Sequence, residues 1–261
     1  MPRLSNRQWA WIGITFAIYA VLAGWPFALA LVISVGFHEY CHLLMAHKLG
    51  METEGFTMIP FVGGLAYVSS KYKNLWDKAK VLFAGPIGGG ALALLTFVVY
   101  LATGVPFFAA VAFWMAALNL FNLLPLSFLD GGQLMGTVTF SINRKIGLWI
   151  NIVSTVLAAA LILYANPVLG IFVGILGAMQ IRKEYRNQKL MAMGFPELCS
   201  EDFRKPPLAL TKKQMLRVVG VWVATFLILG SFCLSLYKSP LTNISILTNH
   251  SAIGDQPGAR P

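Results

Sequence analysis

Charged residues are scarce in this chain of 261 residues, at 11% of the total. Soluble globular domains carry about 25%, so the composition excludes an ordinary soluble domain. Hydrophobic residues make up 57%, and the mean hydropathy is +0.69. Cysteine is rare too: Cys41, Cys199 and Cys233 are an odd number without paired spacing, which argues against a disulfide framework. An integral membrane protein is the class that remains.

Long apolar segments predict an all-α polytopic membrane protein. Segments of roughly 17 residues or more are long enough to span a bilayer as helices. The first and sixth candidates are short, so we expect six to seven transmembrane helices. The candidate segments are 8–24, 26–47, 79–102, 106–129, 146–164, 167–182 and 214–237.

Basic residues outnumber acidic ones by 20 to 10, and their distribution predicts the orientation of the chain. If the N-terminus is cytoplasmic, all lysines and arginines except Lys238 and Arg260 fall on the cytoplasmic side. This is the positive-inside bias of multi-pass proteins. A nucleic-acid partner is therefore the weaker reading of the net charge of +10. We expect a bacterial cytoplasmic membrane protein.

Residues 49–78 interrupt the helical pattern between the second and third apolar segments, and residues 56–68 stand out within them. They read as two short apolar strands around a Gly63-Gly64 turn, which predicts a re-entrant or interfacial β-hairpin. Such a hairpin either accepts an extended peptide by β-addition or is a simple interfacial element. The predicted organisation is an N-terminal anchor helix (1–25), a membrane core (26–135), further transmembrane helices with a basic cytoplasmic loop at 183–213 (136–238), and a flexible tail (239–261).

The sequence His38-Glu39-Tyr-Cys-His42 lies inside an apolar run. On a helix, this spacing places two imidazoles on one face, where they suit a zinc ion, with the glutamate as general base. A zinc hydrolase needs a third protein ligand. Asp130 is the candidate, because it and Glu39 are the two acidic residues embedded at the ends of apolar segments, where carboxylates are functional by default.

These motifs resemble the site-2 protease family of intramembrane zinc metalloproteases, peptidase family M50. The first family motif matches His38-Glu39-x-x-His42, and the second, Asn-x-x-Pro followed by Leu-Asp-Gly, matches residues 122–131. Ile59-Pro-Phe-Val-Gly-Gly64 and Ala84-Gly-Pro86 resemble the intervening hairpin and third core helix. The resemblance implies one zinc ion per chain, held by His38, His42 and Asp130, with Glu39 as general base. It also implies a minimal form without an extra regulatory domain.

The chain departs from the family pattern at two places. Ser127 and Phe128 stand where prolines are frequent, and Gly89 lies in the region of a frequent asparagine.

Further residues near the motifs have two readings each. Asn122 either contacts the substrate or a developing oxyanion, or caps the broken helix. We expect Gly63 and Gly64 to hold substrate. Cys41 is interpreted as a packing residue and His47 as an interfacial one, rather than as metal ligands.

The function that follows is hydrolysis of a peptide bond in or beside a transmembrane helix of a membrane-protein substrate. The cofactor is Zn²⁺, and the partners are the lipid bilayer and that substrate. A regulatory membrane partner or a homo-oligomer stays open. The alternatives are a non-proteolytic membrane chaperone or pseudoprotease, and a metal transporter, on the same scaffold.

Overall fold

A computed structural model of the chain describes residues 4–61, 63–68, 72–165, 167–199 and 208–237. This part of the chain is mostly helical, with one antiparallel hairpin, as predicted. The predicted tail at 239–261 and residues 200–207 of the predicted basic loop lie outside it. The elements are α1 (Asn6–Ala23), α2 (Trp25–Lys48), β1 (Thr53–Ile59), β2 (Gly63–Val68), α3 (Leu75–Thr103), α4 (Pro106–Asn122), α5 (Asp130–Ile142), α6 (Arg144–Ala165), α7 (Pro167–Ala192), the 3₁₀ turn η1 (Pro196–Leu198) and α9 (Lys212–Tyr237).

Four helices of the described chain are long and apolar enough to cross a membrane: α2, α3, α6 and α9. In the most apolar 18-residue stretches of α6 and α9, only 22% and 17% of the residues, respectively, are buried. Apolar helices that keep most of their surface uncovered suit a lipid environment. Helix α4 is apolar but shorter, at 17 residues. An integral membrane protein is thus supported, whereas the predicted number of spans is not settled.

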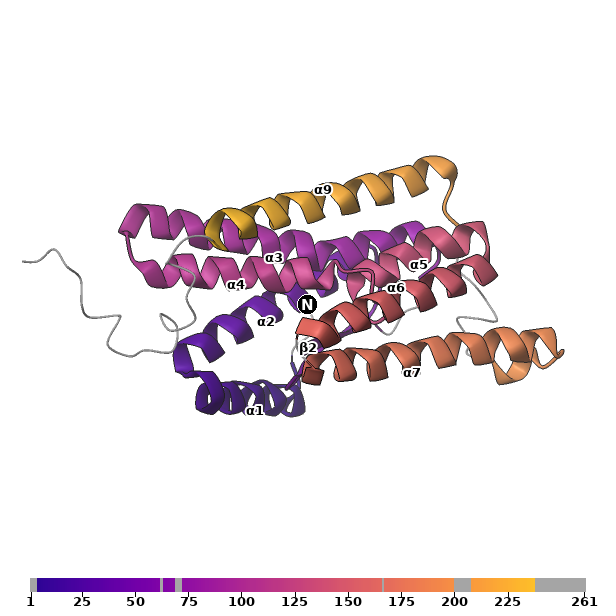
Figure 1. Cartoon of the computed structure of the whole chain (residues 1–261), viewed down its shortest axis with the longest axis horizontal. Coiled ribbons are helices and arrows are strands. Elements are labelled where there is room, and N and C mark those ends of the chain that lie inside the picture. The colour runs from indigo at the N-terminus through magenta and orange to yellow at the C-terminus, as the bar shows by residue number, and fades with distance from the viewer. Residues whose placement is uncertain (1–3, 62, 69–71, 166, 200–207, 238–261) are drawn as a thin grey trace, which may run out of the picture. The chain divides into compact units, whose positions relative to one another are not determined.

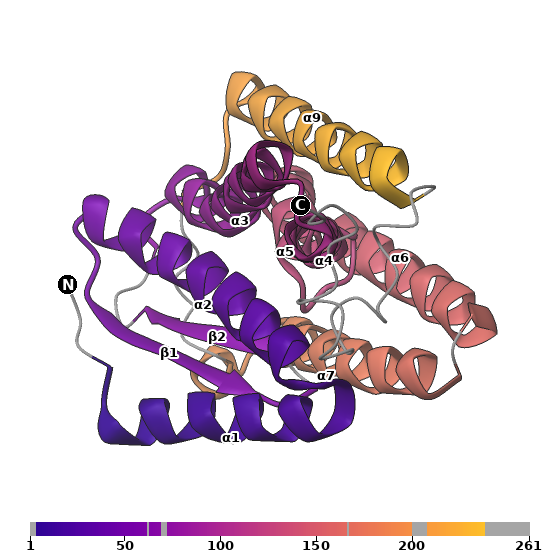
Figure 2. The same cartoon turned by 90° about the vertical axis from the view of Figure 1, so that its left-hand side faces the viewer.

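The chain divides into two compact units. The first comprises residues 1–70, 84–121 and 225–261, and the second comprises residues 71–83 and 122–224. In the first unit the hairpin lies between α1 and α2 (Figure 2). Leu43 of α2 and Phe56 and Met58 of β1 form its buried core. Burial of these apolar side chains positions the hairpin against α2, the helix that carries the histidine motif.

Polar side chains of α1 satisfy backbone groups of β1. Gln8 Nε2 donates to the carbonyl of Glu54 at 3.0 Å, and Thr15 Oγ1 donates to the carbonyl of Met58 at 3.3 Å. Both side chains are buried. Non-helical backbone at membrane depth requires such internal partners. Helix α1 therefore stabilises the hairpin through these two hydrogen bonds.

The hairpin turns before the two glycines rather than at them, so the predicted Gly63-Gly64 turn is wrong. Ile59 pairs with Gly63 and Met58 pairs with Gly64, which makes the glycines the first residues of β2. The chain reverses after Ile59, where Phe61 adopts a positive φ of 65°. The backbone N–H of Phe61 donates to Tyr19 Oη at 3.1 Å. This tether to α1 explains how a bulky residue occupies a conformation that usually favours glycine.

Small residues in the middle of α3 let other helices approach closely. A Cβ on Gly88 would collide with Cys41 of α2, and one on Gly90 would lie 2.9 Å from Leu229 Cδ2 of α9. Close helix packing through small residues is typical of membrane bundles. The glycine-rich run therefore brings α2 and the C-terminal part of α9 against α3 within the first unit.

In the second unit α6 and α7 run side by side, and α5 packs against α6 (Figure 1). Helix α7 continues to Ala192, so residues 183–192 of the predicted basic loop are helical. Helix α5 starts at Asp130, after a non-helical segment at 123–129. A Cβ on Gly131 or Gly132 would collide with the backbone carbonyl of Leu123 or Leu126. The paired glycines therefore let the start of α5 pack directly on the preceding segment.

Candidate metal centre

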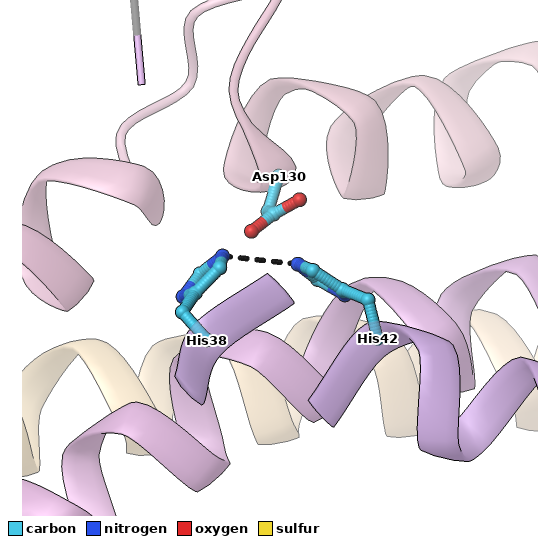
Figure 3. A group of neighbouring side chains, drawn as sticks. All are labelled: His38, His42 and Asp130. Atoms are coloured by element: carbon cyan, nitrogen blue, oxygen red, sulfur yellow. Dashed lines mark hydrogen bonds between the residues drawn. The ribbon is translucent and has the colours of Figure 1, made fainter. Parts of the chain in front are cut away.

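His38 and His42 lie one turn apart on the same face of α2, and both are buried. Their Nε2 atoms are 2.9 Å apart, and their rings are nearly perpendicular at 79° (Figure 3). The i, i+4 spacing on a helix is what directs the two imidazoles to a common point. The predicted pairing of these two side chains is thus present in the fold.

Gly85 of α3 faces the two ligand nitrogens. A Cβ at this position would collide with His42 Nε2 and would lie 2.6 Å from His38 Nε2. The absence of a side chain therefore leaves the space on this side of the nitrogens clear. Two imidazole nitrogens beside a clear space are a donor set that fits zinc.

Asp130 completes a group of three candidate ligands with His38 and His42. One ligand atom from each of the three residues lies within 4.8 Å of the other two (Figure 3). Two neutral imidazoles and one carboxylate are a common ligand set of catalytic zinc sites, which keep a further position for water or substrate. The three residues form a candidate zinc site, and the predicted zinc cofactor agrees with their chemistry.

Asp130 is the first helical residue of α5, next to the N-cap residue Leu129. A carboxylate in the first helical turn interacts favourably with the helix dipole. Tyr72, in the same unit, interacts electrostatically with the Asp130 carboxylate. Burial, and then the negative charge of Asp130, raise the pKa of the Tyr72 phenol. Tyr72 therefore stays a neutral hydrogen-bonding group well beyond neutral pH.

Glu39 follows His38 on α2 and is also buried. Its carboxylate lies against β2, because a Cβ on Gly64 would collide with Oε1 of Glu39 and lie 2.6 Å from its Cδ. A buried carboxylate beside a metal centre is suited to accept a proton from water. Gly64 thus contacts the candidate general base, a placement that the sequence did not predict.

Asn119 of α4 is the residue that sequence reasoning missed. It is 1% exposed, and its Oδ1 lies 2.8 Å from His38 Nδ1. The available signal was a polar amide inside an apolar helix, where polar residues are rare and mostly functional. The hydrogen bond makes Asn119 a direct partner of a candidate metal ligand.

The remaining predicted residues take different places. Asn122 is the half-buried last residue of α4, and Gly63 begins β2 with a φ of 111° and open space around its Cα. Their roles toward a substrate stay predictions. Cys41 Sγ packs against Gly88, and His47 is exposed near the end of α2.

Comparison with known proteins matches the part of the chain that carries the histidine motif. The family model of peptidase family M50 matches residues 26–115, which include the histidine motif, the hairpin and Ala84-Gly-Pro86. The Mycobacterium tuberculosis protein named "Putative zinc metalloprotease Rip3" is 34% identical over 130 residues, covering 46% of this chain and 32% of that protein. The Synechocystis protein named "Putative zinc metalloprotease sll0528" is 32% identical over 123 residues, covering 44% of this chain and 32% of that protein.

The match spans about a third of the length of these curated relatives. The family model's match at 26–115 contains the two histidines, Glu39 and Gly85. The resemblance inferred from the motifs is confirmed: residues 26–115 are similar to peptidase family M50, and the relatives that match are named as zinc metalloproteases.

Proposed function

We propose that this protein is an intramembrane zinc metalloprotease that hydrolyses a peptide bond in, or next to, a transmembrane helix of another membrane protein. The observation that carries the proposal is the group of His38, His42 and Asp130, with ligand atoms within 4.8 Å of one another, beside the buried carboxylate of Glu39. The apolar helices and the relatives named as zinc metalloproteases support it.

Each residue of the group has a role that follows from its atoms. His38 and His42 would bind one zinc ion through Nε2, and Asp130 through a carboxylate oxygen. When bound, zinc acts as a Lewis acid that makes water more acidic and polarises a carbonyl. Glu39 accepts the proton of the attacking water at a carboxylate oxygen and then donates it to the departing amine nitrogen. The peptide C–N bond breaks, and a carboxylate and an amine are released.

The hairpin offers a surface for an unwound substrate. Strand β2 pairs with β1 on one side in a two-stranded sheet, and Gly64 of β2 lies against Glu39. An extended peptide added to β2 would therefore run close to the proposed base. A transmembrane helix has to unwind locally before its peptide bond becomes accessible. We assign Gly63 and Gly64 to this strand contact and Asn122 to the substrate or the developing oxyanion.

The proposal includes the topology expected from the charges. Six to seven helices would span a bacterial cytoplasmic membrane, with the N-terminus and the site on the cytoplasmic side. Cleavage would then fall near the cytoplasmic end of the substrate helix. Non-proteolytic escort of membrane helices and metal transport are the rival functions on the same scaffold.

Quantitative proteomics of membranes from cells expressing the wild-type or the Glu39→Gln protein tests the proposal. A single-pass protein should accumulate intact in the variant, and its soluble fragment should appear only with the wild type. A membrane proteome that is identical in both strains would reject proteolysis. Zinc flux into proteoliposomes that is lost on Asp130→Ala would reject it in favour of transport.

A further inference from the structure

The amide of Asn119 has a fixed orientation. Its Nδ2 donates to the carbonyl of Met115 at 2.7 Å, one turn earlier in α4. A carbonyl oxygen only accepts, so this bond identifies the amide nitrogen, and Oδ1 must be the atom facing His38. Oδ1 lies 2.8 Å from His38 Nδ1 and accepts a hydrogen bond from the Nδ1–H group. The Nδ1-protonated tautomer of His38 leaves the lone pair on Nε2, the atom 2.9 Å from His42 Nε2.

Gly89 makes the space that Asn119 uses. It lies one turn after Gly85 on α3, and it is buried. A Cβ on Gly89 would collide with Oδ1, Nδ2 and Cγ of Asn119. Any other residue at this position would therefore push the amide away from His38. Two glycines on one face of α3 thus leave space around the His38 imidazole. Gly85 leaves space at Nε2, and Gly89 leaves space for Asn119, the partner of Nδ1.

We propose that Asn119 is a positioning residue that holds His38 in the tautomer and ring orientation needed to bind zinc, and that Gly89 is the slot in which its amide fits. The inference rests on the proposed metal site. Ligating histidines commonly donate their second ring N–H to an acceptor that fixes the tautomer and strengthens the ligand. Asn119 acts through His38 and does not itself contact the metal or the substrate.

The test measures the zinc dissociation constant of the full-length protein in detergent by competition with a chelating dye. Asn119→Leu keeps the approximate volume but removes the acceptor, and it should weaken zinc binding by about 10- to 100-fold, the usual effect of losing such a partner. Asn119→Asp keeps an acceptor oxygen toward Nδ1 and should bind zinc much more tightly than Asn119→Leu. Thermal unfolding of the zinc-free proteins reports folding separately.

Moving the amide to the other helix gives a sharper test. A Cβ at residue 89 would lie so close to the present position of Asn119 Oδ1 that an asparagine side chain at residue 89 could place its own Oδ1 there. Asn119→Ala combined with Gly89→Asn should therefore recover most of the zinc affinity that Asn119→Ala loses. Gly89→Asn alone should weaken binding, because it collides with Asn119. Recovery in the double variant is a non-additive result that a general packing defect would not produce.

Met115→Leu is the matched control, because it changes a buried side chain of α4 but keeps the backbone carbonyl that orients Asn119. Its zinc affinity should equal that of the wild type. Wild-type affinity in folded Asn119→Leu, or equally weak binding by Asn119→Asp and Asn119→Leu, would overturn the inference. If Asn119→Leu does not fold, the Asp variant and the double variant decide. A wild-type protein without zinc affinity would instead reject the proposed function.

Discussion

The Cα of Gly64 faces the carboxylate of Glu39 so closely that a Cβ there would overlap Oε1 and Cγ. A strand of the hairpin and the proposed general base therefore share one contact, made possible by the missing side chain. Strand β2, which we propose to receive the substrate, therefore also packs against Glu39 and positions it. Substitution at this contact separates base positioning from metal binding.

Gly64→Ala should reduce proteolysis while leaving zinc bound. The new methyl group displaces the flexible end of Glu39, and a misplacement of about 1 Å can cost on the order of 100-fold in rate. The three atoms nearest to a Cβ at position 64 all belong to Glu39, so zinc content should stay at the wild-type level. Cleavage rate and zinc per chain are measured on the same preparation. Gly220→Ala, where a Cβ has no neighbour within 4 Å, is the control and should retain activity.

Gly85→Ala should weaken zinc binding itself. Its methyl group would occupy the space in front of His42 Nε2 and His38 Nε2, and the rings would have to turn away. We expect a loss of affinity of about 10- to 100-fold, as when groups that support metal ligands are changed. Chelator competition measures it, with Gly230→Ala of α9 as a helix glycine that has open space around it. Equal zinc affinity in the two variants would contradict the close approach of Gly85.

Gly132→Ala should destabilise the start of α5. The methyl group would meet the backbone of Leu126, which cannot move aside as a side chain can. Overpacking of this kind costs about 1–3 kcal/mol, measured as the free energy of unfolding in mixed micelles. Gly136→Ala lies on the same helix, where a Cβ would meet Phe140 at an ordinary 3.4 Å, and it should be neutral. A variant at 132 as stable as the one at 136 would argue against this packing.

Trp222 supports the segment that precedes Asp130. Its indole Nε1 donates to the carbonyl of Leu123 at 2.9 Å, just after α4 has ended. Trp222→Phe removes the donor and should lower the free energy of unfolding by about 0.5–1.5 kcal/mol. Trp149→Phe changes an exposed side chain and serves as the comparison, with little or no effect expected. The two unfolding curves should therefore differ in midpoint, and coincident curves would contradict the role of this bond.

Local patterns were enough to propose the ligand group, because each residue's chemistry can be read locally, and the role of these residues as ligands stays a prediction. The i, i+4 histidines depend only on helix geometry, and Asp130 stands out as a carboxylate beside apolar segments. The hairpin was also predicted, but its turn was placed at Gly63-Gly64 instead of between Ile59 and Gly63. Glycine pairs usually mark turns, and the sequence did not reveal that Tyr19 holds Phe61 in a positive-φ conformation.

The contact between Asn119 and His38 was beyond sequence reasoning. Asn119 and His38 are 81 residues apart, and no spacing rule connects them. Gly89 was noticed only because an asparagine was expected near it, and the structure fills that region with the amide of Asn119 from another helix. The number of membrane spans also stays a prediction, because α4 ends at Asn122 and is shorter than its apolar segment suggested.

The central claim is that Glu39 moves the proton while His38, His42 and Asp130 hold the metal. The most direct test purifies the wild-type and Glu39→Gln proteins, measures zinc per chain, and follows cleavage of a single-pass substrate in proteoliposomes by mass spectrometry. Glutamine keeps the size of the side chain but cannot accept the proton, so the account predicts one zinc ion per chain in both proteins and a cleavage rate lower by at least about 100-fold in the variant, the scale of general acid–base catalysis. A Glu39→Gln protein that retains zinc and cleaves at the wild-type rate would contradict it.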